Sequence, residues 1–211
     1  MAGAVRLPGV VAARAVEVVA LDVGDLEPDR PRRAAPRPLL SQGAAYGLRA
    51  APRDADLWRF HHALTEARRI RGTDPADARS AYRRAMPEWH GRTVLMSVPG
   101  PPALLERRRL TGMRLAARLE LAELDVRLGS SGEAAEALES LGAENPHNER
   151  LYGPWMLALY REGRTAEALA VFQRIRRTLV HDLGVDPGPP LTTLQSRILN
   201  ADPTLTEPRR G

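Results

Sequence analysis

The fold is decided by the stretch WMLALYREGRTAEALAVFQRIRRTLVHDLGVDPG, residues 155–188. Apolar residues recur at helical spacing on both sides of Gly163, and a glycine there suits the left-handed backbone that ends a helix. Thr165 is placed to cap the second helix, and Gly184 is placed to end it. The stretch therefore predicts two helices joined by a tight turn. Their predicted core residues are Trp155, Leu159, Ala168, Phe172 and Ile175.

The same pattern recurs upstream, as it does in a repeated helical hairpin. Ala78 and Tyr82 repeat the spacing, and Ala137 with Leu141 begins it again after Gly129. A small residue followed four positions later by a larger one, behind a Gly-containing turn, is typical of tetratricopeptide-like repeats. We therefore predict an all-α fold, a tetratricopeptide-like array of helical hairpins with Ala78, Tyr82 and Ala137 in its core. The alternative is another antiparallel helical bundle, because such bundles use similar turns and apolar stripes.

Composition points to a globular protein of one large domain or two small ones. The chain has 211 residues, 43% of them hydrophobic, and no cysteine, which excludes disulfides and thiolate metal sites. No long apolar run is free of charge, so we expect a cytoplasmic protein with no membrane segment. The formal net charge is +5, and all 31 basic residues are arginine. Abundant Arg, Ala and Pro are also what a GC-rich genome encodes, so the charge alone does not establish nucleic-acid binding.

The chain divides into three predicted parts. Residues 1–48 form a poorly ordered segment, in which residues 39–48 alternate weakly and predict a strand or a small hairpin. Residues 54–202 form the helical domain, with Asp54 or Asp56 capping its first helix, a long central helix near residues 103–128 and a closing helix over residues 191–199. Residues 203–211 are predicted to be a disordered tail. A proline-rich loop in the first part carries Arg30, Arg32, Arg33 and Arg37.

No group of residues in the sequence has the pattern of a catalytic, metal or cofactor site. His61 and His62 are adjacent on a helix and face different directions, and the Gly129–Gly132 turn lacks the lysine of a nucleotide-binding loop. We therefore expect no enzyme activity, no metal and no cofactor. The arginine clusters at residues 107–109 and 174–177 have two interpretations, solvation of helix faces or contact with an acidic partner or phosphate backbone, and we favour solvation.

The order of these signals resembles one known family. DLWRFHHALTEAR, DPADARSAYRRAM, LALYREGRTAEALAVF and LGVDPGP, between residues 56 and 189, closely resemble the bacterial transcriptional activator domain of the Streptomyces antibiotic regulatory protein family. The resemblance covers residues 54–202. It implies a transcriptional activator whose helical domain follows a winged-helix DNA-binding domain. It also implies homodimerisation, contact with RNA polymerase and binding to promoter DNA repeats.

The chain departs from the family pattern at its start. Residues 26–48 resemble the stretch after the recognition helix, including a remnant of the wing, but the first 25 residues do not resemble a recognition helix. The start is therefore truncated or misassigned, or the protein is a stand-alone activator domain. We expect weak DNA binding by this chain, through phosphate contacts of Arg30, Arg32, Arg33 and Arg37. The competing functional hypothesis is a protein–protein interaction scaffold with no direct role at DNA.

Overall fold

The computed structural model of the chain describes residues 39–42, 45–48, 56–89 and 100–206, most of which are helical. The chain divides into two compact units. One comprises residues 1–65 and 84–112, and the other comprises residues 66–83 and 113–211. The helices α2 (Asp56–Ile70), α3 (Pro75–Ala85) and α4 (Pro101–Arg127) each contribute residues to both units.

The first unit contains a β-hairpin and the packed beginning of the helical domain. The strands β1 (Leu39–Gln42) and β2 (Ala45–Leu48) pair antiparallel, as the alternating sequence predicts. In α2, Phe60 is buried and its ring centroid lies 5.3 Å from that of Trp89, just after the 3-10 turn η2 (Met86–Glu88). Arg59 Nε lies 2.7 Å from Glu88 Oε2 and ties the same two segments together. The predicted alternative cap Asp54 lies outside the described residues.

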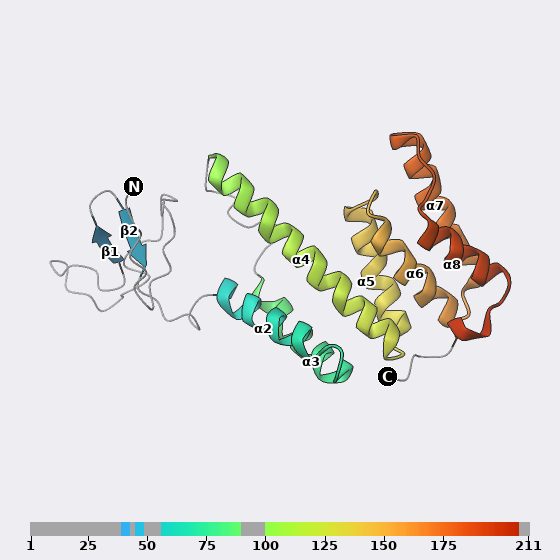
Figure 1. Cartoon of the computed structure of the whole chain (residues 1–211), viewed down its shortest axis with the longest axis horizontal. Coiled ribbons are helices and arrows are strands. Elements are labelled where there is room, and N and C mark those ends of the chain that lie inside the picture. The colour runs from blue at the N-terminus through green and yellow to red at the C-terminus, as the bar shows by residue number, and fades with distance from the viewer. Residues whose placement is uncertain (1–38, 43–44, 49–55, 90–99, 207–211) are drawn as a thin grey trace. The chain divides into compact units, whose positions relative to one another are not determined.

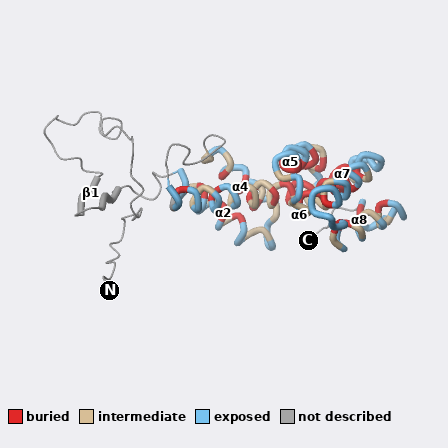
Figure 2. The backbone as a smooth tube through the Cα atoms, turned by 90° about the horizontal axis from the view of Figure 1, so that it is seen from above, coloured by how far each residue is buried: buried red, intermediate tan, exposed pale blue. Residues whose placement is uncertain are grey.

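The second unit contains the helices that form the array. They are α3 (Pro75–Ala85), α5 (Ser131–Glu144), α6 (Glu149–Arg161), α7 (Thr165–Leu183) and α8 (Pro189–Leu199), followed by the 3-10 turn η3 (Pro203–Leu205). In Figure 1, α5, α6 and α7 lie side by side, and α8 packs against α6 and α7 at the end. Buried residues line the inward faces of these helices, as Figure 2 shows. The fold is all-α in its main domain, as the sequence predicts.

Most of the predicted core residues are buried in this unit. They come from the two hairpins that the sequence pattern singled out, and none exceeds 3% exposure. Their burial fits the apolar stripe that the helical spacing predicts. These residues are Ala78, Tyr82, Trp155, Leu159, Ala168, Phe172 and Ile175.

Ala137 corrects the predicted alignment of the repeats, because its side chain is exposed. The buried apolar residues of α5 include Ala134, Leu138 and Leu141. Ala134 lies 34 residues before Ala168, and 34 residues is the period of tetratricopeptide repeats. The three helices α3, α5 and α7 each begin three residues before Ala78, Ala134 and Ala168 respectively. The repeat is therefore present, and only its copy in α5 begins three residues earlier than predicted.

The helix ends of α7 partly match the prediction. Gly163 and Gly184 both have the left-handed backbone conformation expected of them, with φ of 75° and 71°. Thr165 is wrong as the cap, because it is the first helical residue. The capping position belongs to Arg164, whose side chain makes no capping hydrogen bond. The missing side-chain cap leaves the first backbone N–H groups of α7 at the protein surface.

The predicted disordered tail begins too early. Asp202 accepts a hydrogen bond from the Thr204 backbone N–H at 2.9 Å, and η3 follows it. Leu205 is 5% exposed and belongs to the main core. Arg161 Nε donates to the Leu205 carbonyl oxygen at 2.8 Å, which anchors the turn to α6. The ordered chain therefore extends at least to Thr206, and residues 207–211 lie outside the described residues.

Candidate protein-interaction groove

A groove of about 460 Å³ runs between α5 and α7, with α6 beneath it. Its floor is formed by Trp155 and Leu159, and small side chains of Ala135 and Ala170 lie along its sides. Pockets of this volume are within the range that binds ligands or side chains of a partner. Because the floor is apolar and the rim is charged, the groove has the layout of a protein-interaction site.

The floor depends on a close approach between α5 and α6. Gly142 on α5 is buried against the indole of Trp155, and a Cβ added at this glycine would lie 3.1 Å from Trp155 Cζ3. That distance is shorter than an ordinary van der Waals contact between carbon atoms. The glycine therefore lets the indole lie against α5. Gly142 was missed by the sequence analysis, although a glycine inside a helix is the signal that could have identified it.

The α7 wall of the groove is basic. Arg174 places its guanidinium carbon 5.2 Å from the centre of the Trp155 ring, within the range of a cation–π contact. Arg177 donates from Nε to the Gln173 carbonyl oxygen at 3.3 Å. Arg176, on another side of the helix, pairs with Asp186 at 3.1 Å. The 174–177 cluster is thus split, with Arg174 and Arg177 at the groove and Arg176 held by a neighbouring carboxylate.

The α5 wall and the start of α7 are acidic. Glu136 and Glu139 line the groove from α5, and Glu167 lines it from the first turn of α7. Arg164 reaches Glu167 through two hydrogen bonds of 2.7 and 2.6 Å, and this contact lowers the pKa of the Glu167 carboxyl. Within the described ranges, no ion pair joins Glu136 or Glu139 to a basic residue. All three glutamates are exposed, and the sequence alone does not indicate that they lie at one groove.

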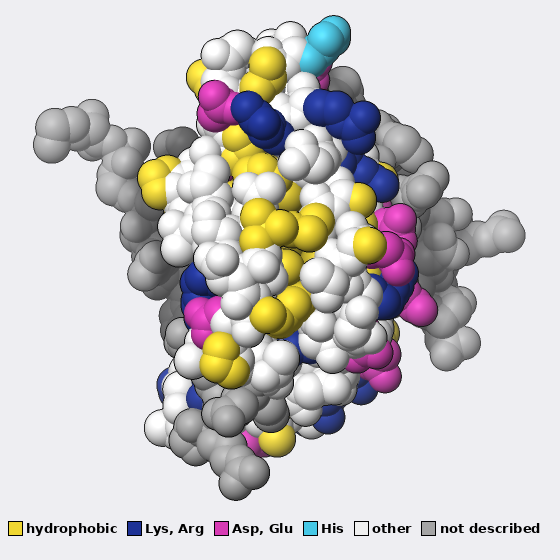
Figure 3. Space-filling model, turned by 90° about the vertical axis from the view of Figure 1, so that its right-hand side faces the viewer, with side chains coloured by type: hydrophobic (Ala, Val, Ile, Leu, Met, Phe, Trp, Pro, Cys, Tyr) yellow, Lys and Arg dark blue, Asp and Glu magenta, His cyan; other side chains and the backbone are white. Residues whose placement is uncertain are grey.

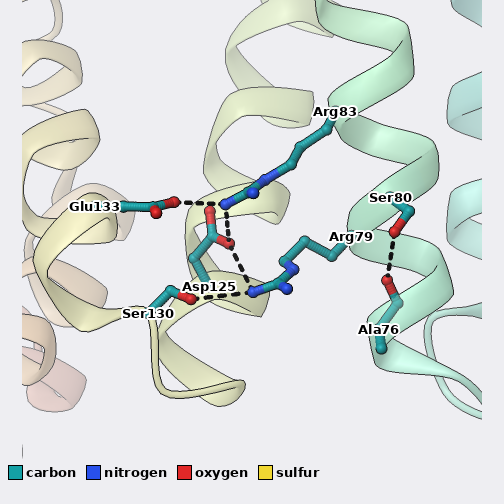
Figure 4. Close-up of polar contacts among 7 residues, drawn as sticks. All are labelled: Ala76, Arg79, Ser80, Arg83, Asp125, Ser130 and Glu133. Carbon is teal, nitrogen blue, oxygen red and sulfur yellow. Dashed lines mark hydrogen bonds and ion pairs between the residues drawn. The ribbon is translucent and has the colours of Figure 1, made fainter.

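A second polar cluster joins α3 to the α4–α5 corner, at the preceding interface of the array. Asp125 Oδ1 lies 3.2 Å from Arg83 Nη2 and 3.7 Å from Arg79 Nη1. The two arginines also bond to Glu133 and Ser130, so that they bridge three acceptors, as Figure 4 shows. Asp125 is 6% exposed, and burial raises the pKa of its carboxyl, while Arg83 and Arg79 partly offset the increase.

The second half of α7 presents a further open surface beside the groove. A shallow depression of about 780 Å³ follows it from Gln173 to Asp182 and shares Arg174 and Arg177 with the groove. Three large apolar side chains at this end are about half exposed: Val180 at 48%, Leu183 at 58% and Val185 at 50%. Figure 3, which faces the α7 and α8 side, shows hydrophobic side chains bordered by basic and acidic groups. The surface is amphipathic rather than uniformly charged.

The remaining predicted site residues have simpler positions. The proposed phosphate contacts Arg30, Arg32, Arg33 and Arg37 lie outside the described residues. In the cluster at residues 107–109, Arg109 pairs with Glu106 at 2.6 Å. His147 and His181 both contact Asp182, at 2.8 and 2.6 Å. They do not form a metal site, because no metal-binding group of three side chains occurs among the described residues.

Comparison with known proteins assigns this architecture to a family. The model of the bacterial transcriptional activator domain matches residues 55–199, which include the groove and every helix from α3 to α8. The chain belongs to the bacterial transcriptional activator domain family. Its curated relatives place it among the Streptomyces antibiotic regulatory proteins, as the sequence resemblance predicted. No helix in the described part is long and apolar enough to span a membrane.

Three similar proteins illustrate the relationship. The regulatory protein AfsR of Streptomyces coelicolor is 44% identical over 82% of this chain, and the match covers 17% of AfsR. The regulatory protein DnrI of Streptomyces peucetius is 36% identical over 75% of this chain, and the match covers 58% of DnrI. The structure of Mycobacterium tuberculosis EmbR in complex with a low-affinity phosphopeptide is 26% identical, with a TM-score of 0.69, over 80% of this chain and 46% of EmbR. The chain therefore spans less than two thirds of each of these proteins.

Proposed function

We propose that this chain acts in transcription regulation, and that its helical domain does so by holding other proteins. The partners implied by the family resemblance are RNA polymerase and a second copy of the chain, with promoter DNA as the site of action in the cytoplasm. The observation that carries the proposal is the groove between α5 and α7, which combines an apolar floor with charged walls inside the matched domain. A groove with an apolar floor and charged walls is suited to hold side chains of a partner protein.

Direct contact with the polymerase is tested by binding. The whole chain, labelled with a fluorophore, is titrated with RNA polymerase holoenzyme from Streptomyces coelicolor, and Arg174→Glu is compared with Arg108→Glu. Arg174 lines the groove, whereas Arg108 is an exposed residue of α4 and carries the same charge. We expect polymerase binding to weaken in Arg174→Glu and to stay unchanged in Arg108→Glu. Equal binding by both variants would contradict the proposed role of the groove wall.

Activation itself is tested by recruitment. The whole chain is fused to an unrelated DNA-binding domain and placed upstream of a reporter promoter in a Streptomyces host. We expect increased transcription only with the fusion that binds the promoter. Sedimentation velocity of the unfused chain measures dimerisation separately. A fusion that binds its DNA but leaves transcription unchanged would contradict activation. If the chain nevertheless forms a dimer, the result would favour an interaction scaffold with no direct role at DNA.

A further inference from the structure

The groove and the polar cluster around Asp125 occupy equivalent places in successive repeats. Ala78, Ala134 and Ala168 start the same buried pattern on α3, α5 and α7. Counting from these alanines, Arg79 corresponds to Ala135, and Arg83 corresponds to Glu139. The two positions that carry arginine at the earlier interface therefore carry alanine and glutamate at the later one.

The acceptors of the two arginines have equivalents as well. Glu133 at the start of α5 corresponds to Glu167 at the start of α7, and Asp125 on α4 corresponds to Leu159 on α6. Glu167 and Leu159 both line the groove, as do Ala135 and Glu139. One repeat earlier, the equivalent place is occupied by the side chains of Arg79 and Arg83, which are larger than the Ala135 and Glu139 side chains at the groove.

The groove is lined by three arginines and three glutamates, but only one of these glutamates takes part in an ion pair among the described residues. The earlier interface has Arg83 beside Glu133. The equivalent residues at the groove are Glu139 and Glu167, so the groove has two carboxylates where the earlier interface has a cation and a carboxylate. Arg164 pairs with Glu167 at 2.6 Å, but within the described ranges Glu136 and Glu139 have no ion-pair partner. An arginine supplied from outside could pair with Glu139 and Glu167 much as Arg83 pairs with Glu133, although Leu159 stands where Asp125 binds Arg83. Arginine suits such a site because its planar guanidinium binds carboxylates through paired hydrogen bonds.

The other end of the groove has the opposite charge. Arg174 and Arg177 follow Glu167 by two to three helical turns, which places their backbone about 10–15 Å further along α7. Arg174 lies over the indole of Trp155, so its position at the groove is fixed by contact. A uniformly basic segment would therefore be attracted at one end and repelled at the other. The two ends together select a segment that carries both charges.

We propose that the groove binds an extended segment of a partner protein with an arginine beside Glu139 and an acidic residue near Arg174 and Arg177. An extended chain advances about 3.3 Å per residue, so the two charged residues are separated by about three positions. This inference rests on the proposed function only in that the helical domain holds partner proteins. It adds the chemistry of the segment that is held and the residues that select it.

The experiment measures binding of short fluorescent peptides to the whole chain by anisotropy. The probe carries Arg and Glu three positions apart, in either order, on an alanine and leucine background, and the controls carry two Arg or two Glu. We expect one order of the mixed-charge probe to bind about tenfold more tightly than either like-charge control. Equal binding of a like-charge control, or no binding of either mixed-charge probe, would overturn the proposal.

The decisive variant is Glu139→Arg, which restores the residue type of Arg83 at the equivalent position. The new arginine side chain can pair with Glu167 as Arg83 pairs with Glu133, so the variant should fold normally. The same side chain should fill part of the groove and compete with a bound peptide. Peptide affinity should fall about tenfold, whereas Glu144→Arg, the same charge change at an α5 residue outside the groove, should leave it unchanged. Thermal melts of both variants confirm folding. Unchanged peptide affinity in a folded Glu139→Arg variant would overturn the proposal.

The same variants separate this proposal from the proposed function. Polymerase binding that survives in Glu139→Arg would overturn the groove as the partner's site and leave the proposed function standing. Peptide binding that follows the expected pattern, in a chain that does not bind the polymerase, would support the groove and overturn the polymerase as the partner.

Discussion

Arg83 Nη2 lies 3.2 Å from Asp125 Oδ1 and so places a cation against a carboxylate that is almost fully buried. The same nitrogen lies 2.5 Å from Glu133 Oε2, which is exposed. One guanidinium therefore links α3 to α4 and α5. Burial makes ionisation of Asp125 unfavourable, and the arginine reduces that cost, so the interaction is worth more than an exposed surface pair.

This arrangement predicts a pH-dependent effect of Arg83→Gln on stability. Because burial raises the pKa of Asp125 above its unfolded value, the folded protein holds this proton more tightly, and stability falls as pH rises through the interval between the two values. Loss of Arg83 raises the folded pKa further and widens that interval. We therefore expect a stability loss that is small near pH 4 and reaches about 1–3 kcal/mol at pH 7.

Urea melts across this pH range measure the effect. Arg69→Gln is the control, because Arg69 forms an exposed pair with Glu66 within α2 and should change stability by less than about 0.5 kcal/mol. A loss in Arg83→Gln that is as large at pH 4 as at pH 7 would show that Asp125 does not titrate as its burial implies.

Gly142 predicts a second, independent effect. A methyl group at this position would lie 3.1 Å from Trp155, so Gly142→Ala should force the indole to shift, and Gly142→Leu should disrupt the contact between α5 and α6. In Gly142→Ala the steric cost should offset the gain in helix propensity, so its stability should stay within about 1 kcal/mol of the starting protein, whereas Gly142→Leu should lose about 3 kcal/mol. The matched control is Gly112→Ala in α4, where nothing lies within 4 Å of the added carbon. Helix propensity should make that control more stable, by up to about 1 kcal/mol. Chemical denaturation of the three variants decides, and a Gly142→Leu protein as stable as Gly112→Ala would refute the contact.

Much of the fold was predictable because it depends on local signals. Gly163 and Gly184 mark turns that need a left-handed backbone, and Ala168 with Phe172 marks the face that must be buried. The error at Ala137 has a physical cause. α5 is rich in alanine, so several alignments place a small residue before a leucine, and only the 34-residue distance from Ala134 to Ala168 selects the correct one.

The groove was not predictable in the same way. Its charged residues, Glu139 and Arg174, look like solvated helix surface when each helix is considered alone. Their shared position depends on the stacking of α5 on α6 and of α6 on α7, which brings together residues distant in the sequence. The correct repeat alignment would have shown that Arg83 is replaced by Glu139. The replacement of Arg83 by Glu139 is therefore visible in the sequence, but only when the repeat is aligned on Ala134 rather than on Ala137.

The centre of the last hairpin predicts large effects of core substitutions. Phe172 is 3% exposed, so Phe172→Ala should cost about 3–5 kcal/mol through lost burial and the remaining cavity. Ala168 is fully buried, so Ala168→Arg should be worse, because no space exists for a long charged side chain. Ala166→Arg, at an exposed position two residues away in α7, is the matched control. Thermal melts decide, and an Ala168→Arg protein that melts with the control would refute the hairpin packing.

The contacts of the turn η3 predict that residues beyond α8 stabilise the folded chain. Leu205 is 5% exposed in the main core, and its carbonyl oxygen accepts a hydrogen bond from Arg161. Removal of residues 203–211 exposes core surface and leaves Arg161 with one fewer acceptor, so we expect a loss of about 2–3 kcal/mol in urea melts. Removal of residues 207–211 alone keeps Leu205 and its hydrogen bond to Arg161, so it should cost less than the larger truncation. Leu205→Ala in the complete chain should reproduce most of the larger loss. If both truncated chains unfold at the same urea concentration as the complete chain, the turn contributes nothing to the core, and the original expectation of a disordered tail from Pro203 would be correct.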